Sequence, residues 1–162
     1  MLYRNINEFL KSLSGDKRIM CLDFGEKKIG IAFSDKTKTI ATAHSIYYRQ
    51  NTSKDLGYLS KILQENEATT IVIGLPLKMN GQENEWCEKV IQFANKLVKK
   101  CKVSIYLQDE RLSTRFANAI VEKTGMSIIK SKKLYDKISA CIILQHALDK
   151  ISNIQKNIKL CQ

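Results

Sequence analysis

The sequence is poor in residues that break regular structure and has no long hydrophobic run. One proline and seven glycines in 162 residues exclude collagen-like and proline-rich disordered chains. No apolar stretch approaches the ~18–20 residues that span a bilayer, and the first twenty residues are too polar for a secretory signal. These absences predict a folded protein that resides in the cytoplasm and has no membrane partner.

The cysteines are badly spaced for the sites that they commonly form, and histidines are few. The five cysteines are odd in number and never form a Cys-x-x-Cys pair, which argues against a disulfide framework and against a zinc knuckle. His44 and His146 are the two histidines, so a histidine-rich metal site or a Ser-His-Asp triad has few candidates. We expect both histidines in structural or surface roles.

Positive charge, by contrast, is abundant. Lysine and arginine number 27 against 16 acidic residues, which gives a net charge of +11. Such an excess predicts a polyanionic partner, and nucleic acid is the first candidate. Lysine supplies most of the excess, and it suits diffuse attraction to phosphate better than base-specific recognition.

The apolar periodicity predicts an α/β domain, since short apolar runs alternate with amphipathic stretches. The predicted strands are residues 19–24, 28–35, 40–48, 70–75 and 103–107. The predicted helices are residues 53–66, 83–100, 113–123 and 134–151, with a basic loop at 124–133. This order predicts a mixed five-stranded sheet with an antiparallel hairpin edge, parallel central strands and helices on both faces.

The length of the chain favours one domain. We assign residues 1–18 to an N-terminal extension, residues 19–151 to the folded domain and residues 152–162 to a polar tail that frays.

Three acidic positions stand out as candidates for chemistry. Asp23 is the only charge in an apolar strand, and a buried carboxylate costs several kcal/mol unless it is paired or binds metal. Glu110 and its neighbour Asp109 follow the last predicted strand, where acids also suit a solvated helix N-terminus. Asp136 shares a helix face with Ala140, so that face is expected to pack against protein.

Sites in such sheets gather outside the carboxyl ends of the parallel strands, so these acids can converge. Convergent carboxylates on a lysine-rich protein favour a Mg²⁺ or Mn²⁺ site that acts on phosphate, because hard cations take oxygen ligands. Two ions are expected, since paired metals stabilise both the attacking and the leaving oxygen. A structural role remains the alternative for Asp23, as an acid paired with lysine or capping a turn.

Four spaced motifs resemble one known family. They are LDFGEKKIGIA at residues 22–32, IGLPL at 73–77, DERLST at 109–114 and DKISACIILQ at 136–145. Together they are similar to the YqgF family of bacterial RuvC-like proteins, which are considered pre-16S rRNA nucleases or Holliday junction resolvases. The resemblance implies a ribonuclease H-like fold and a metal-dependent phosphodiesterase site. It maps the catalytic and metal-binding acids onto Asp23, Glu110 and Asp136.

The chain also departs from the family pattern. After the Gly-Leu-Pro-Leu motif the family usually has Asn-Met-Asp-Gly-Thr, whereas this chain has Lys78, Met79, Asn80, Gly81 and Gln82. That loop has lost an acid and gained a base, but the three candidate ligands are intact. Asp109 is a second-tier candidate ligand.

The resemblance implies processing of the 5′ end of pre-16S rRNA during ribosome biogenesis, with resolution of branched DNA as the alternative. A phosphotransferase of the actin and sugar-kinase type is a further alternative, because Asp23, Gly25 and Gly30 also resemble the phosphate-binding hairpin of that fold. Such proteins close two domains around the nucleotide, and this chain has room for one. A non-catalytic RNA-binding module is a third possibility.

Basic residues near these motifs are the candidate phosphate contacts. They are Lys27, Lys28, Arg111, Arg115, Lys130, Lys132 and Lys133. Trp86 and Phe93 lie at helical spacing, and we expect them in the core before any role in stacking on bases. The oligomeric state does not follow from the sequence.

Overall fold

The computed structural model describes the backbone of residues 1–111 and 128–160, and the side chains of residues 1–111, 138–158 and 160. Its strands are β1 (Leu2–Tyr3), β2 (Arg18–Phe24), β3 (Lys28–Ser34), β4 (Ala41–Tyr48), β5 (Ala68–Leu75) and β6 (Ser104–Asp109). Its helices are α1 (Ile6–Leu10), α2 (Thr52–Glu65), α3 (Glu85–Cys101) and α5 (Ile128–Leu160). The predicted helix at 113–123 lies outside the described residues.

The strands form one mixed sheet in the order β1-β6-β5-β2-β3-β4. Strands β2, β3 and β4 pair antiparallel, whereas β2 with β5, β5 with β6 and β6 with β1 pair parallel. The predicted antiparallel edge and parallel centre are therefore confirmed. The predicted strand count is wrong, because the described part of the sheet has six strands and the sequence indicated five.

The sixth strand, β1, comes from the residues that we assigned to an N-terminal extension. Leu2 pairs with Ile105, and the amino group of Met1 donates to the Val103 carbonyl oxygen at 2.8 Å. Phe9 of α1 is fully buried and stacks on Tyr106 with ring centroids 5.5 Å apart. A two-residue strand shows no periodicity, so its sequence could not reveal it. The division of the chain at residues 18 and 151 stays a prediction.

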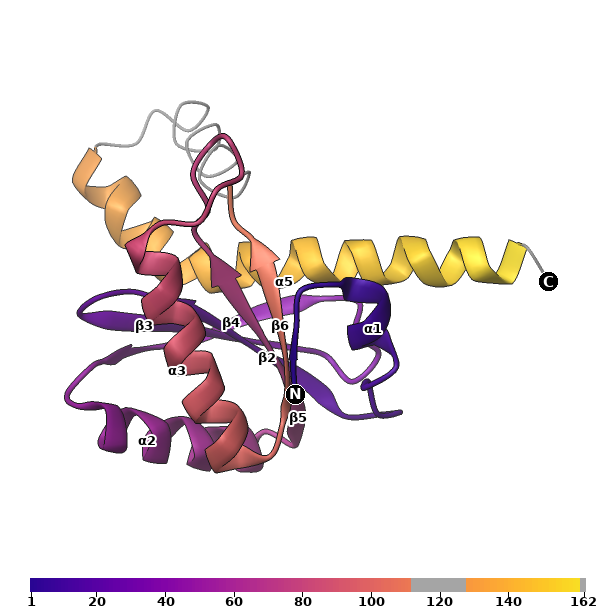
Figure 1. Cartoon of the computed structure of the whole chain (residues 1–162), viewed down its shortest axis with the longest axis horizontal. Helices are drawn as coiled ribbons and strands as arrows, with labels where there is room; N and C mark the ends of the chain where they lie inside the picture. The colour runs from indigo at the N-terminus through magenta and orange to yellow at the C-terminus, as the bar shows by residue number, and fades with distance from the viewer. Residues whose placement is uncertain (112–127, 161–162) are drawn as a thin grey trace.

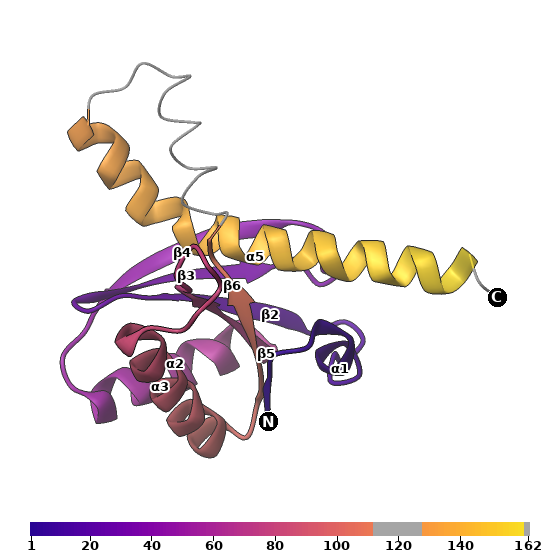
Figure 2. The same cartoon turned by 45° about the horizontal axis from the view of Figure 1, so that its top comes forward.

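Helices cover both faces of the sheet (Figures 1 and 2). Helices α2 and α3 lie on one face and α5 crosses the other, as predicted. Alternate residues of a strand point to opposite faces, so Met20, Leu22 and Phe24 of β2 join the core under α2 and α3. Ile19 and Cys21 join the core under α5.

Helix α5 is longer than the helix predicted at 134–151. It begins at Ile128, so residues 128–133 are helical rather than part of a loop, and it continues to Leu160 through the tail that we expected to fray. Its middle is anchored by buried residues, among them Ile143 and Leu148. Because a helix that is already nucleated extends at little cost, the polar residues on either side continue it.

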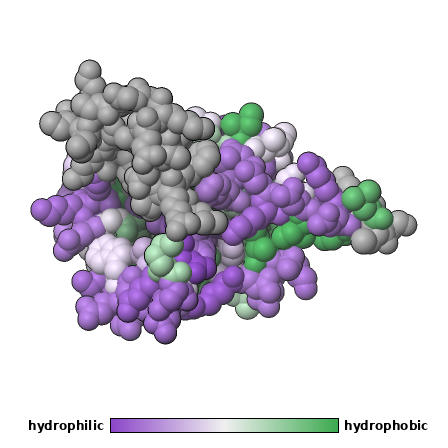
Figure 3. Space-filling model, turned by 90° about the horizontal axis from the view of Figure 1, so that it is seen from above, coloured by the Kyte–Doolittle hydropathy of each residue, from purple (hydrophilic) through white to green (hydrophobic). Residues whose placement is uncertain are grey.

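The surface agrees with the charged composition. On the face viewed in Figure 3, most of the coloured residues are hydrophilic. None of the described helices combines the length and the apolar character that crossing a membrane requires.

A buried ion pair joins the β4–α2 connection to the β2–β3 hairpin. Asp55 of α2 is completely buried and accepts from Arg49 Nε at 3.1 Å and from the Gln50 amide at 3.0 Å. The same guanidinium donates to the carbonyl oxygens of Gly25 at 3.1 Å and Glu26 at 3.3 Å. Asp55 thus holds Arg49 against the hairpin that follows β2.

Replacing Asp55 by alanine should destabilise the protein by about 3–5 kcal/mol, because the Arg49 guanidinium would lose its buried partner. Urea unfolding measures the change. Glu65→Ala is the control, since the Glu65–Lys61 pair is exposed and should contribute at most about 0.5 kcal/mol. Equal effects of the two substitutions would show that the buried pair does not stabilise this connection.

Candidate active site

Two of the three predicted acids lie together at one end of the sheet. Asp23 is the sixth residue of β2 and points to the α5 face, as do Cys21 two residues earlier and Ile19 four residues earlier. Glu110 directly follows β6, and its amide donates to the Leu75 carbonyl oxygen of β5 at 3.2 Å. Strand β5 separates the strands that carry the two acids.

Gly74 of β5 makes room for the Glu110 side chain. A Cβ atom built at Gly74 would lie 1.3 Å from Glu110 Oε1 and 2.8 Å from Glu110 Cγ. The carboxylate therefore lies directly over the glycine backbone, in the space that a side chain at position 74 would fill. This places the Glu110 carboxylate between its own strand and the strand of Asp23.

Burial and neighbouring charges shift the titration of groups at this end of the sheet. Burial, together with the negative charges of Asp23 and Asp109, raises the pKa of Glu110 to about 8. Burial also raises the pKa of the Cys21 thiol, and the charges of Glu110 and Asp23 add to that shift. Both acids thus influence one neighbouring thiol, and their surroundings disfavour the charged form of Glu110.

Helix α5 covers Asp23 on the face of the sheet to which this side chain points. Ser139 Oγ donates a hydrogen bond to Asp23 Oδ2. Asp23 pairs across the hairpin with Gly30, where a Cβ atom would lie 3.5 Å from both Ala140 Cβ and Ser139 Oγ. Small residues on both sides therefore let the helix approach the sheet.

The third predicted acid, Asp136, lies in α5 three residues before Ser139. Its side chain is outside the described part of the structure. Among the side chains that are described, no three His, Cys, Asp or Glu residues are close enough to hold a metal ion together. The convergence of all three acids stays a prediction.

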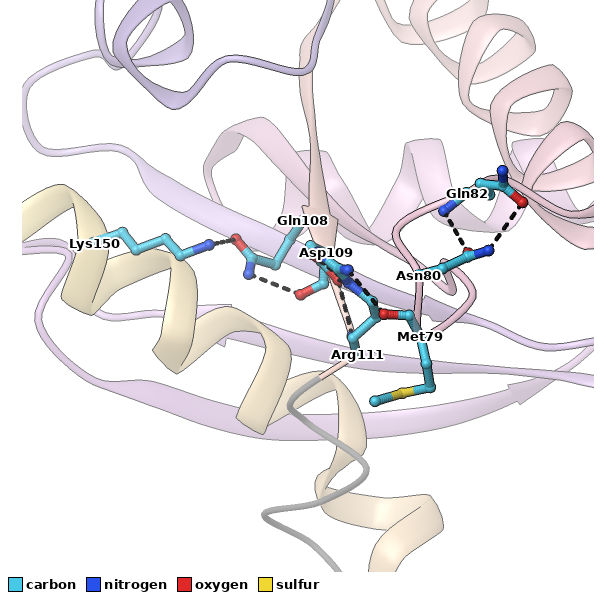
Figure 4. A network of polar contacts seen from close by, with 7 residues as sticks. All are labelled: Met79, Asn80, Gln82, Gln108, Asp109, Arg111 and Lys150. Atoms are coloured by element: carbon cyan, nitrogen blue, oxygen red, sulfur yellow. Dashed lines mark hydrogen bonds and ion pairs between the residues drawn. The ribbon is translucent and has the colours of Figure 1, made fainter.

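Asp109 is engaged by Arg111 (Figure 4). Arg111 Nη2 and Nε lie 2.7 and 2.9 Å from Asp109 Oδ2, and the guanidinium holds the pKa of this carboxyl below its usual range. Arg111 Nη1 also lies 3.4 Å from the Met79 carbonyl oxygen. Arg111 thus connects the end of β6 to the loop that follows β5.

That loop contains the departure from the family pattern, and Asn80 organises it. Asn80 Oδ1 accepts from the Gln82 amide at 3.0 Å, and the Gly81 amide donates to the Lys78 carbonyl oxygen at 2.8 Å. Gly81 has a φ of +84°, which suits glycine. Asn80 stands where the family usually has aspartate, and its side-chain oxygen accepts the backbone hydrogen bond that an aspartate oxygen can also accept. The turn therefore does not need the acid.

The predicted phosphate contacts are distributed unevenly. Lys27 is exposed in the β2–β3 hairpin, Lys28 is half-buried at the start of β3, and Arg111 is paired with Asp109. The remaining candidates have side chains outside the described residues: Arg115, Lys130, Lys132 and Lys133.

The two histidines lie on β4 and α5. His44 is exposed on β4, and its ring contacts Phe33 edge-on. His146 is half-buried on α5, two turns beyond Ser139.

Sequence reasoning missed what Gly74 does for the site. The motif contains this glycine, but its role depends on Glu110, which is 36 positions away and on another strand. A glycine inside a β-branched strand is nevertheless a usable signal, since it marks a position where another group approaches the backbone.

Comparison with known proteins agrees with this architecture. A family model described as "RuvX: Holliday junction resolvase" matches residues 17–150. A protein of Wolbachia pipientis wMel is 67% identical over 155 residues, covering 96% of this chain and 100% of the relative. A protein of Ehrlichia ruminantium (strain Welgevonden) is 54% identical, covering 96% of this chain and 99% of the relative. Both relatives are named "Putative pre-16S rRNA nuclease".

Among solved structures, T. thermophilus RuvC in complex with a Holliday junction substrate has a TM-score of 0.54. Its identity is 8%, and the match covers 85% of this chain and 96% of that chain. This likeness confirms the predicted ribonuclease H-like fold. Because the family model matches most of the chain and the relatives are similar over nearly their full length, the chain belongs to the RuvX/YqgF family.

Proposed function

We propose that this protein is a metal-dependent nuclease that hydrolyses phosphodiester bonds, with Asp23, Glu110 and Asp136 as its catalytic acids. The observation that carries the proposal is the placement of the Glu110 carboxylate over Gly74, beside Asp23. Family membership supports it, because the family and the similar relatives are named as nucleases or resolvases.

The residues fit a hard divalent cation. Two carboxylates on one face supply the oxygen ligands that Mg²⁺ and Mn²⁺ prefer. Burial first, and then the charge of Asp23, raise the pKa of Glu110, and a bound cation would favour the ionised carboxylate against both effects. Asp136 lies one helical turn before Ser139 in α5, and we propose it as the third ligand.

The protein's own groups have distinct tasks in this proposal. Asp23 and Glu110 hold the cation and fix where the scissile phosphate lies. Ser139 donates to one oxygen of Asp23 and so orients its carboxylate. When bound, the metal supplies an activated water and stabilises charge on the phosphate oxygens.

The proposed substrate is the precursor of 16S rRNA, cleaved at its 5′ end during ribosome biogenesis in the cytoplasm. The names of the similar relatives support RNA as the substrate. Branched DNA is the second candidate, since the matching family model is described as a Holliday junction resolvase. The net charge of +11 suits either polyanion.

Cleavage of labelled pre-16S rRNA, four-way junction DNA and single-stranded RNA, each with Mg²⁺, Mn²⁺ or EDTA, tests the function. We expect metal-dependent cleavage of the rRNA precursor and none in EDTA. Preferred cleavage of the junction would make the protein a resolvase, whereas binding without any cleavage would make it a non-catalytic module.

Replacing Asp23 by asparagine should lower the cleavage rate by at least ~10²-fold, roughly 2.7 kcal/mol of transition-state stabilisation. Without metal the variant should fold as well as the parent or better, because a repulsion between partly buried carboxylates is removed. Added Mg²⁺ should raise the melting temperature of the parent more than that of the variant. Parental cleavage by the variant would remove Asp23 from the mechanism.

Replacing Gly74 by alanine should displace the Glu110 carboxylate, since the new methyl group would occupy its place. We expect at least about a tenfold loss of cleavage and a smaller Mg²⁺-dependent rise in melting temperature, with the metal-free fold retained.

Gly57→Ala is the matched control, because no atom lies within 4 Å of its added Cβ on α2. That variant should cleave normally and gain about 0.5–1 kcal/mol of stability. Normal cleavage and normal metal stabilisation in Gly74→Ala would contradict the proposed role of Glu110.

A further inference from the structure

A cleft of about 260 Å³ lies on the opposite face of the sheet from the acids, between the β2–β3 hairpin, the start of α2 and helix α3. Three aromatic rings and three cations line it: Phe24, Phe93, Trp86, Arg49, Lys89 and Lys96. Glu26 is the one acid on its rim. The cleft therefore combines an apolar floor with a positive edge.

The aromatic floor is built from both the sheet and α3. The Phe24 and Phe93 ring centroids are 4.4 Å apart, and Trp86 stacks on Phe24 at 5.9 Å with an interplanar angle of 27°. Phe93 is buried, as the sequence predicted, but Trp86 is only half-buried. An indole that is left partly open at a cleft offers a surface on which a planar group can stack.

The cations are spaced so that they flank this floor. Lys89 and Lys96 follow Trp86 by three and ten residues, which places them along the same side of α3. Lys89 Nζ lies 5.2 Å from the Trp86 ring centre, and the Arg49 guanidinium lies 4.3 Å from that of Phe24. Asp55, completely buried, fixes Arg49 in this place. The edge of the cleft is thus partly preorganised.

This chemistry matches a nucleotide of a single strand. Aromatic platforms with a cationic border are typical of sites that bind single-stranded nucleic acid, because every unpaired base has a face that can stack. Bases in a duplex keep their faces covered. The small volume suits one base rather than a larger ligand, for which pockets are ~300–1,000 Å³.

The cleft also lies close to the proposed catalytic acids along the chain. Phe24 follows Asp23 directly, and their side chains point to opposite faces of the same strand. The β2–β3 hairpin, with exposed Glu26 and Lys27, follows both residues directly. A strand bound both at the acids and at the aromatic floor would pass around this hairpin.

We propose that this cleft binds an unpaired nucleotide of the substrate strand, with its base stacked on Trp86 and its phosphates beside Lys89 and Lys96. The inference rests on the proposed nuclease function and specifies its substrate as single-stranded next to the cut. Arg49 and Asp55 position the aromatic floor and the hairpin around that base.

Trp86 is the only tryptophan in the chain, so its emission reports on the cleft directly. A 12-nucleotide single-stranded oligouridylate is titrated into the protein in EDTA, with binding followed by anisotropy of a label on the RNA. We expect Trp86 emission to be quenched with the same midpoint as the anisotropy change. A duplex RNA of equal length should bind with little quenching.

The double variant Lys89→Gln/Lys96→Gln should bind at least about fivefold more weakly, and its salt slope should be smaller by about 1.4, as expected for two lost contacts to a single strand. Lys99→Gln/Lys156→Gln removes the same charge from exposed positions outside the cleft and should bind like the parent.

Saturable RNA binding with unchanged Trp86 emission would overturn the inference, and so would equal weakening by the two double variants. Failure of the nuclease proposal looks different: the parent would cleave none of the substrates in Mg²⁺, whatever happens at the cleft. A parent that cleaves, together with silent Trp86 emission, removes the cleft and leaves the nuclease proposal standing.

Discussion

The repulsion between two carboxylates on one face of the sheet is the constraint on which the site depends. Asp23 and Glu110 come from strands separated by β5, and Gly74 is what allows the second acid to lie beside the first. On β3, the strand on the other side of Asp23, Gly30 leaves room for α5 to approach the sheet. Ser139 of that helix donates a hydrogen bond to Asp23. Small residues thus surround two carboxyl groups whose full ionisation is unfavourable, and in our proposal a bound cation relieves this.

Opposite faces of the same sheet end carry different chemistry. Carboxyl groups lie under α5, while aromatic rings and cations lie between the hairpin and α3. The alternation of a β-strand produces this division, since Asp23 and Phe24 are neighbours that point in opposite directions. In our proposals one nucleic-acid strand meets both faces, held by stacking on one and cut on the other.

The sequence predicted the sheet because its long strands are continuous apolar runs, and Asp23 was found because it interrupts one of them. It did not predict β1, which is too short to show a period and exists through pairing with β6. The length of α5 was underestimated because helix propagation, rather than an apolar face, extends it to Leu160.

The candidate site was foreseeable only in part. Its acids are visible as residues out of place, but the contact of Glu110 with Gly74 is a property of the folded sheet. The partial exposure of Trp86 was equally hidden, because helical spacing alone assigns it to the core beside Phe93. Both features depend on how segments far apart in the sequence pack together in the folded domain.

A crystal structure with Mn²⁺, located by its anomalous scattering, tests the central claim most directly. The account predicts that carboxylate oxygens of Asp23, Glu110 and Asp136 lie within roughly 2–2.5 Å of an ion, with two ions, if both bind, ~3.5–4 Å apart. Manganese bound elsewhere, or an Asp136 side chain directed away from Asp23 and Glu110 in a protein that still cleaves, would contradict it.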